Sequence, residues 1–285
     1  MTALKTAAKL QEPRLIDLSL PIDERLPVWP GDPLFATRPV ACHELDGYRV
    51  DAITLGTHTG THIDMPFHAF VDGEKSGDLP LDYFYGTAAV LDLTPVINDP
   101  GSAGTTGNAG SERDPSPEKG ESSFALESRH LAPFEDILAN VPRILLKTGW
   151  SSHFGQSDYY HCFPSLMPEA LEYLAGFPIL LLGLETPSLF ADLPENLPLN
   201  LLDADHAGHR LLLGRIPPIL LLESLASLES LPAYRPGQEK NVVLPFHQDD
   251  MRLFTLSCFP LPVTEADAAP ARAVAIVNPR AAALS

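Results

Sequence analysis

The stretch HTGTHIDMPFH, which runs from His58 to His68, decides the fold that we expect for this 285-residue chain. It holds three of the ten histidines of the chain together with one aspartate. Counted from His58, the residues His62, Asp64 and His68 stand at offsets of 4, 6 and 10, all of which are even. On an extended strand such side chains share one face, whereas a helix would point Asp64 and His68 away from the other two. The spacing therefore predicts a strand with one polar face.

The same stretch has to bend if its polar side chains are to meet. A straight strand would separate His58 from His68 by ~33 Å, because each residue advances roughly 3.3 Å, while metal ligands lie about 2 Å from their ion. Gly60 and Pro66 disfavour a helix and allow the bends. Imidazole nitrogens with a carboxylate suit Zn²⁺, Mn²⁺ or Fe²⁺, and a carboxylate can bridge two ions. The pattern therefore favours a metal site over a structural or pH-sensitive cluster.

The composition is that of an acidic globular protein. Hydrophobic residues make up 45% of the chain, which is ample for a core, and the formal net charge is -18. The acid excess argues against nucleic acid as a partner, since phosphate binding relies on clustered Lys and Arg. Cys42, Cys162 and Cys258 form no CxxC pair, so neither a disulfide framework nor a cysteine zinc site is indicated. Without a signal-peptide h-region or a bilayer-length apolar run, we expect a cytoplasmic protein with no membrane segment.

Apolar runs along the chain predict a strand-rich α/β fold. Strands are expected over residues 14–22, 48–60, 87–97, 141–150, 178–188, 216–228, 252–263 and 271–277, and a helix over 165–177. Residues 98–123 hold no apolar residue larger than alanine and are dense in Gly, Ser, Pro and charge, which predicts a mobile insertion loop. Because structure resumes on both sides of this loop, we expect a single domain over residues 1–285 with a mixed sheet.

The stretch HTGTHIDMPFH matches the pattern H-x-G-T-H-x-D-x-P-x-H, and on it the chain resembles the cyclase family of metal-dependent hydrolases. The similarity extends to IDLSLPIDERLPVWPGDP, LLKTGW, FPSLMPEALEYLAGFPILLLGLETPS, HRLLLGRIPPILLLESL and ARAVAIV, nearly the whole chain apart from its N-terminal lead and residues 98–123. The resemblance implies a swivelling β/β/α-type fold, in which a mixed sheet curls around the site and helices flank it. It also implies one or two divalent ions, zinc or manganese, and a homodimer or homotetramer.

The resemblance assigns roles to residues of the stretch. His58, His62 and Asp64 fall at metal-ligand positions of the family. His68 falls at the position of a histidine that serves as general acid and base, or as a ligand of a second ion.

Further site residues are implied outside the stretch. Glu223 in LLLES matches a glutamate of the family, and His209 in HRLLL is favoured as the accompanying histidine. His206 stays open as the alternative, because the 14-residue spacing from His209 to Glu223 is slightly long. Trp29 in VWPGD falls where family members carry an aromatic residue at the pocket mouth, although packing under the Pro-rich turn would equally explain it.

The chain departs from the family pattern in the segment GLETPSLF. Glu185 stands where the family usually carries aspartate, and a further carboxylate is missing near Phe190. We expect these changes to alter the substrate pocket more than the metal chemistry. Tyr160 and His161, which precede the predicted helix, are expected at the surface rather than in a pocket.

The activity implied by the resemblance is metal-dependent hydrolysis of an amide. The leading substrate is N-formyl-L-kynurenine, which an arylformamidase cleaves to kynurenine and formate. An isatin-type cyclic amide is the nearest alternative, and a non-catalytic metal- or ligand-binding member of the same fold is the rival from another class. Serine hydrolysis is disfavoured because no G-x-S-x-G elbow surrounds Ser188.

Overall fold

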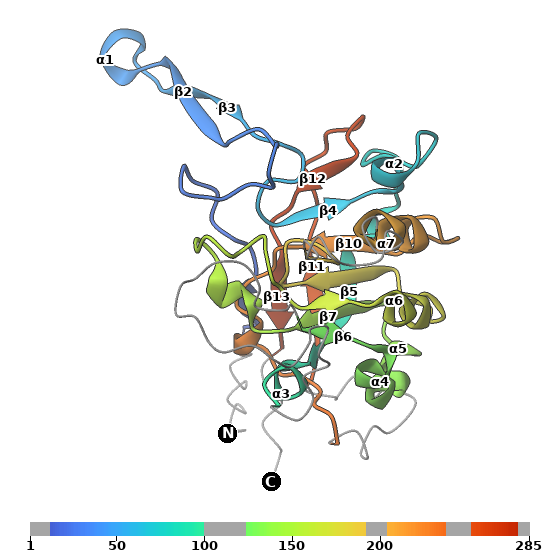
Figure 1. Ribbon diagram of the computed structural model, residues 1–285. Helices are drawn as coiled ribbons and strands as arrows, with labels where there is room; N and C mark the ends of the chain where they lie inside the picture. Colours follow the sequence, from blue (N-terminus) through green and yellow to red (C-terminus); the bar gives the residue numbers. More distant parts are fainter. Residues whose placement is uncertain (1–11, 100–123, 192–203, 238–251, 279–285) are drawn as a thin grey trace, which may run out of the picture.

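The fold is built on a nine-stranded mixed sheet with helices along one side (Figure 1). The computed structural model describes residues 12–99, 124–191, 204–237 and 252–278. The strands of the sheet, in the order in which they lie side by side, are β1 (Arg14–Asp17), β13 (Val274–Val277), β11 (Leu253–Ser257), β5 (Tyr85–Asp92), β7 (Arg143–Lys147), β9 (Leu181–Leu184), β10 (Leu220–Glu223), β4 (His62–Asp64) and β12 (Ala268–Pro270). The α/β class with a mixed, curled sheet and flanking helices, predicted from the sequence, is confirmed. Of the predicted insertion, residues 100–123 lie outside the described residues.

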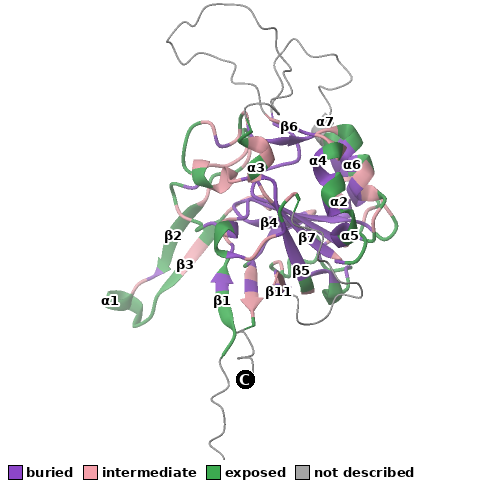
Figure 2. Cartoon of the chain, turned by 90° about the horizontal axis from the view of Figure 1, so that it is seen from below, coloured by how far each residue is buried: buried purple, intermediate pink, exposed green. Residues whose placement is uncertain are grey.

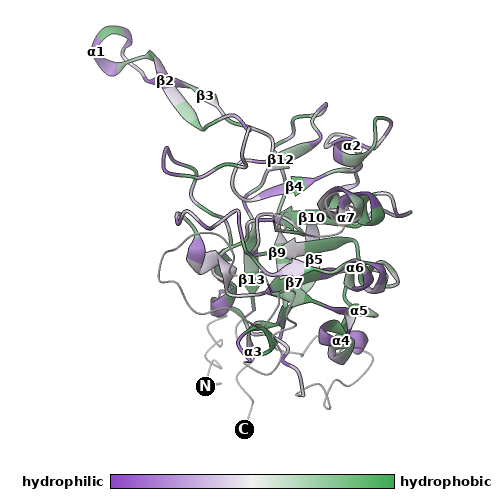
Figure 3. Cartoon of the chain, viewed as in Figure 1, coloured by the Kyte–Doolittle hydropathy of each residue, from purple (hydrophilic) through white to green (hydrophobic). Residues whose placement is uncertain are grey.

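The centre of the sheet is parallel and its two sides are antiparallel. Strands β5, β7, β9 and β10 run parallel to one another. Strands β11, β13 and β1 continue the sheet on one side, and β4 and β12 on the other, all in antiparallel pairs. The central strands are nearly continuous apolar runs, such as LLGL in β9 and LLLE in β10, because both of their faces are covered (Figure 3). Glu223 is therefore an isolated charge at the carboxyl end of a buried strand.

The sheet curls until its two halves meet. Ser19, just beyond β1, forms an antiparallel bridge with Leu225, which follows β10 on the other half of the sheet. Close to this bridge, the N–H of Ala226 donates to the carbonyl of Leu18 at 2.8 Å. The closure brings the carboxyl end of β10 against the chain that leads into β4.

Thr61 holds this closure together and is a target for a stability test. Its Oγ1 accepts the N–H of Leu20 at 2.9 Å and donates to the carbonyl of Ser224 at 2.6 Å, in a buried position. In Thr61→Val both backbone groups would lose their partner, so we expect ~1–3 kcal/mol less free energy of unfolding. Thermal denaturation followed by circular dichroism should show a lower midpoint. Thr54→Val, at an exposed site on β3 (Val50–Thr54), is the control, and equal midpoints for the two variants would contradict the role of Thr61.

The helices are short, and most of them lie along one side of the sheet (Figure 1). They are α1 (His43–Asp46), α2 (Pro66–Ala69), α3 (Thr94–Ile97), α4 (Ser128–Leu131), α5 (Glu135–Leu138), α6 (Pro168–Ala175) and α7 (Ala204–Leu213), with 3-10 turns η1 (Leu81–Tyr83), η2 (Ala132–Phe134), η3 (Trp150–His153) and η4 (Leu228–Ser230). The predicted helix is confirmed as α6, which begins at Pro168 and buries Ala170, Leu171 and Leu174. Helix α7 was not predicted. No helix in the described ranges is long and apolar enough to cross a membrane.

Two small sheets complete the fold. Strands β6 (Ala125–Leu126) and β8 (Ser165–Leu166) form a short parallel pair beside α4 and α6. Strands β2 (Ala36–Ala41) and β3 (Val50–Thr54) form a hairpin with α1 at its tip, and this arm projects away from the body (Figures 1 and 2). Most residues of the arm are exposed, including several apolar ones.

Candidate active site

The stretch from His58 to His68 passes through a turn, a strand and a helix. A turn that carries His58 leads into β4, and Gly60 within it has a φ of 66°, a left-handed conformation that favours glycine. Pro66 begins α2, which carries His68. The predicted bends at Gly60 and Pro66 are confirmed, whereas one extended face for the whole stretch is wrong. Only β4 is extended, and the bends at its two ends bring the outer histidines together.

Strand pairing places Glu223 beside this stretch. In the antiparallel register of β10 with β4, Glu223 lies opposite His62. The Nδ1 of His62 is 2.8 Å from the carbonyl oxygen of Gly60, which can only accept, so Nδ1 carries the proton and Nε2 presents its lone pair. This Nε2 lies 3.3 Å from Oδ1 of Asp64 and 3.6 Å from Oε2 of Glu223. Nδ1 of His58 lies 2.9 Å from the same Oδ1.

Helix α7 adds His209 on the other side of the two carboxylates. Its Nε2 lies 3.4 Å from Oδ2 of Asp64 and 3.6 Å from Oε1 of Glu223. Each carboxylate therefore directs one oxygen toward the histidines of the stretch and the other toward His209. His206, one turn earlier on α7, is exposed and lies at the lining of the cavity, so of the two alternatives His209 is the one that faces the carboxylates.

Four buried donor atoms of this centre lie close together without a hydrogen-bond partner among the described residues. Nε2 of His62, both carboxylate oxygens of Asp64 and Oε1 of Glu223 are buried and have no hydrogen-bond partner among the described residues. Buried polar atoms normally have partners, because leaving one unpaired costs ~1–3 kcal/mol. Ligands about 2.0–2.2 Å from one tetrahedral ion are ~3.3–3.6 Å apart, close to the separations seen here. The donor set fits divalent cations.

Burial and charge shift the pKa values of the central groups in different directions. Burial raises the pKa of Glu223, and the neighbouring charge of Asp64 raises it further. For Asp64 itself, the charges of His58 and His62 outweigh burial and hold the pKa well below its usual range. Burial lowers the pKa of His58, but the carboxylates of Asp64 and Asp267 outweigh it and raise that pKa to about 10. The centre concentrates negative charge that attracts cations.

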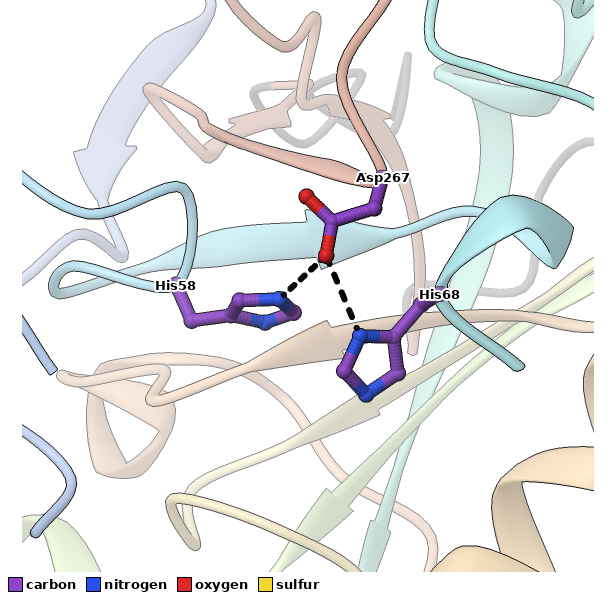
Figure 4. Close-up of side chains that lie close together, drawn as sticks. All are labelled: His58, His68 and Asp267. Carbon is purple, nitrogen blue, oxygen red and sulfur yellow. Dashed lines mark hydrogen bonds and ion pairs between the residues drawn. The ribbon is translucent and has the colours of Figure 1, made fainter. Parts of the chain in front are cut away.

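Asp267, which was not predicted from the sequence, lies at the outer side of the centre beside His58 and His68. Its Oδ2 lies 3.1 Å from Nε2 of His58 and 3.3 Å from Nδ1 of His68 (Figure 4). Hydrogen bonds from these two histidines lower the pKa of Asp267 well below its usual range. Asp267 precedes β12, about 200 residues from the stretch, and no spacing motif singles it out.

Within the described part of the chain, the donor atoms form three overlapping groups, each of which is able to hold a cation. In each group the ligand atoms lie within 4.8 Å of one another, and the groups are His58–His62–Asp64, Asp64–His68–His209 and His58–His68–Asp267. Together they form one continuous centre.

Comparison with known proteins places this chain in a family. The sequence profile of the family described as "Putative cyclase" matches residues 16–189, more than half of the chain. The chain belongs to the cyclase family. A kynurenine formamidase of Bacillus cytotoxicus is 30% identical over 261 residues, covering 91% of this chain and 95% of that protein.

Solved structures of the cyclase fold agree with the architecture. Isatin hydrolase A from Labrenzia aggregata, bound to benzyl benzoate, superposes with a TM-score of 0.68 at 23% identity and covers 94% of both chains. A structure described as a potential metal-dependent hydrolase with cyclase activity superposes with a TM-score of 0.61 at 20% identity, covering 94% of this chain and all of the other. The chain thus shares its fold with metal-dependent hydrolases.

In this cyclase-family chain the centre opens into a cavity of about 240 Å³. Its lining comprises Trp29, Asp32, His58, His62, Asp64, His68, Tyr160, Pro187, Ser188, His206, His209, Glu223 and Ser224. Trp29 packs edge-on against Tyr160 with ring centroids 5.6 Å apart, and the Tyr160 hydroxyl donates to the carbonyl of Pro27 at 2.8 Å. The expectation that Tyr160 is a surface residue is therefore wrong, whereas His161 is exposed.

The departures from the cyclase pattern lie outside the cavity lining. Oε2 of Glu185 accepts the N–H groups of Thr148 and Gly149, each at 2.6 Å, and Oε1 accepts the hydroxyl of Ser151 at 3.0 Å. Glu185 thus fastens the loop that follows β7, and Phe190 is buried elsewhere. Neither Glu185 nor Phe190 lines the cavity, although Pro187 and Ser188 between them do, and the expected effect on the substrate pocket stays a prediction.

Proposed function

We propose that this chain is a metal-dependent arylformamidase that hydrolyses N-formyl-L-kynurenine to kynurenine and formate. The observation that carries the proposal is the set of buried histidine and carboxylate atoms that converge without hydrogen bonds at the base of a cavity with an aromatic wall. The kynurenine formamidase of Bacillus cytotoxicus, similar over 91% of the chain, supports the choice of substrate.

The residues of the centre would hold two ions. His58, His62, Asp64 and Glu223 supply one group of donors, and His209 with the second oxygens of the two carboxylates supplies the other. Nitrogen and oxygen donors of this kind suit zinc or manganese. A bound ion of this type would lower the pKa of water and polarise an amide carbonyl. Elemental analysis of the purified protein tests both the metal's identity and the number of ions.

The remaining cavity residues would bind the substrate and move protons. His68 donates Nδ1–H to Asp267, so its Nε2 is left to accept the proton of the attacking water and deliver it to the departing aromatic amine. Addition of water to the formyl carbon and cleavage of the C–N bond then yield formate and the free amine. Trp29 and Tyr160 form an edge-to-face pair that presents an aromatic surface to an aryl group.

Parallel substrate assays test the proposed activity. We expect the metal-loaded protein to release formate from N-formyl-L-kynurenine and from simple formanilides faster than it opens isatin. Preferred turnover of isatin would instead favour a cyclic amide hydrolase, to which the fold is also similar. A metal-loaded protein inert toward all three substrates would indicate a non-catalytic binding protein and would defeat the enzyme proposal.

We propose that the chain is a homo-oligomer joined through the β2–β3 arm. A two-stranded hairpin is marginally stable by itself in water, and this arm exposes Val40, Leu45, Tyr48 and Ile53. The double variant Leu45→Glu, Ile53→Glu should weaken association at least ~10-fold, measured by sedimentation velocity. Leu81→Glu, at an exposed site on the body, is the matched control. A monomeric wild-type protein, or equal association of both variants, would contradict the proposal.

The cytoplasmic location expected from the sequence stays a prediction. Fractionation of cells that express the untagged protein tests it, and recovery in the secreted or membrane fraction would contradict it.

A further inference from the structure

Asp267 makes contacts of a different kind from the other acidic groups of the centre. Its Oδ2 meets Nε2 of His58 at 3.1 Å and Nδ1 of His68 at 3.3 Å, and both contacts have the geometry of hydrogen bonds (Figure 4). Asp64, by contrast, lies as close to His58 and His62, yet neither of its oxygens has a hydrogen-bond partner among the described residues. Asp267 therefore acts as an acceptor of two N–H groups.

The two hydrogen bonds fix which nitrogen of each ring carries the proton. A carboxylate can only accept, so His58 is protonated at Nε2 and His68 at Nδ1. In the neutral ring that metal binding requires, the lone pair of His58 then lies on Nδ1, the atom that is 2.9 Å from Oδ1 of Asp64. The lone pair of His68 lies on Nε2, which points away from Asp267 (Figure 4). A change of tautomer in either ring would place a proton where the proposed function requires a lone pair.

We propose that Asp267 is a positioning residue that sets the tautomers of His58 and His68 together, coupling metal affinity to proton transfer. The single oxygen that both rings share holds them side by side, with ring centroids 4.5 Å apart. Asp267 sits in the chain before β12, and its backbone carbonyl accepts the N–H of Met65 at 2.9 Å. The backbone is thus tied to the end of β4 independently of the carboxylate.

Replacement of Asp267 tests whether its carboxylate affects catalysis and zinc affinity rather than folding alone. In Asp267→Ala we expect kcat to fall ~10–100-fold and the dissociation constant of zinc to rise ~10-fold, because carboxylates that orient ligand histidines typically contribute this much. Asp267→Asn, which keeps one acceptor oxygen, should lie between Asp267→Ala and the wild type. The kinetic part rests on the proposed function. Zinc affinity, measured by competition with a chelating dye, does not.

The ring protons give a readout that is independent of activity. In ¹H–¹⁵N correlation spectra of the zinc-loaded wild type, we expect His58 protonated at Nε2 and His68 at Nδ1. In Asp267→Ala, the His68 ring should populate both tautomers. If the wild type cleaves no formanilide but shows this change, the proposed function fails while the role of Asp267 stands.

A neighbouring carboxylate provides the matched control. Glu265 lies on the same loop, pairs with Lys75 at 2.5 Å and does not touch a histidine of the centre within the described contacts. Glu265→Gln removes the same charge and should leave zinc affinity, kcat and ring protonation unchanged. Equal behaviour of Glu265→Gln and Asp267→Ala would overturn the proposal. Loss of one bound ion in Asp267→Ala, measured by elemental analysis, would make Asp267 a ligand and would also overturn it.

Discussion

Asp64→Asn is expected to lose bound metal and at least ~10³-fold of the hydrolytic rate. Both oxygens of Asp64 are needed, since Oδ1 faces His58 and His62 while Oδ2 faces His209. The amide keeps one oxygen and places an NH₂ group where the other carboxylate oxygen faced its histidines. Several kcal/mol of metal-dependent stabilisation are then lost, and each 1.4 kcal/mol corresponds to a factor of ten. Elemental analysis and the formanilide assay measure the two losses.

A second buried aspartate distinguishes metal loss from instability. Asp92 is as buried as Asp64, but it pairs with Lys147 and Arg235, each at 3.1 Å, rather than with histidines. Asp92→Asn should lower the midpoint of thermal unfolding while the folded protein keeps its metal. Full metal content in Asp64→Asn would refute the assignment of Asp64 as a shared ligand.

His68→Gln is expected to lower kcat by ~10²–10⁴-fold with little change in KM, the range typical of general acid–base catalysis. Glutamine approximates the size of the side chain but cannot carry the proton from water to the departing amine. Among the described residues, four histidines contact the carboxylates of the centre, and His68 is the most exposed of them. Its replacement should therefore leave the buried donor atoms in place. Kinetics and elemental analysis of the same preparation test the prediction.

The result for His68 also decides between its two possible roles. Unchanged metal content with a low kcat supports proton transfer, whereas loss of one ion would make His68 a ligand, consistent with its grouping with Asp64 and His209. His130→Gln is the control, since His130 in α4 accepts the N–H of Glu127, the residue before that helix, and lies outside the cavity lining. An unchanged kcat in His68→Gln would refute both roles.

Much of the fold was predictable because its signals are local. The buried parallel strands are nearly continuous apolar runs. The predicted segments contain β7, β9 and β10 in full, whereas β5 begins at Tyr85, before the predicted start at residue 87. Helix α6 has a proline at its start and leucines on one face. Helix α7 was missed because its sequence, ADHAGHRLLL, lacks a starting proline and has a narrow apolar face.

The site was predictable only in part, for a related reason. His58, His62, Asp64 and His68 lie within eleven residues, so their spacing and the intervening glycine and proline were enough to predict convergence. The preference for His209 came from family resemblance. It lies one turn from His206 on α7, and only the packing of that helix against β10 sets which of them faces the carboxylates.

The sequence by itself determined that the donor groups of the stretch from His58 to His68 gather, since residue types and short spacings are local properties of the chain. Only the tertiary structure decided which residues from distant parts of the chain lie next to these groups. The register of β4 with β10 set Glu223 opposite His62, and the closure of the curled sheet ordered the surrounding loops. The pairing of β12 with β4 brought Asp267 to His58 and His68 from about 200 residues away. Contacts of this kind depend on strand register and sheet curvature, which no local periodicity encodes.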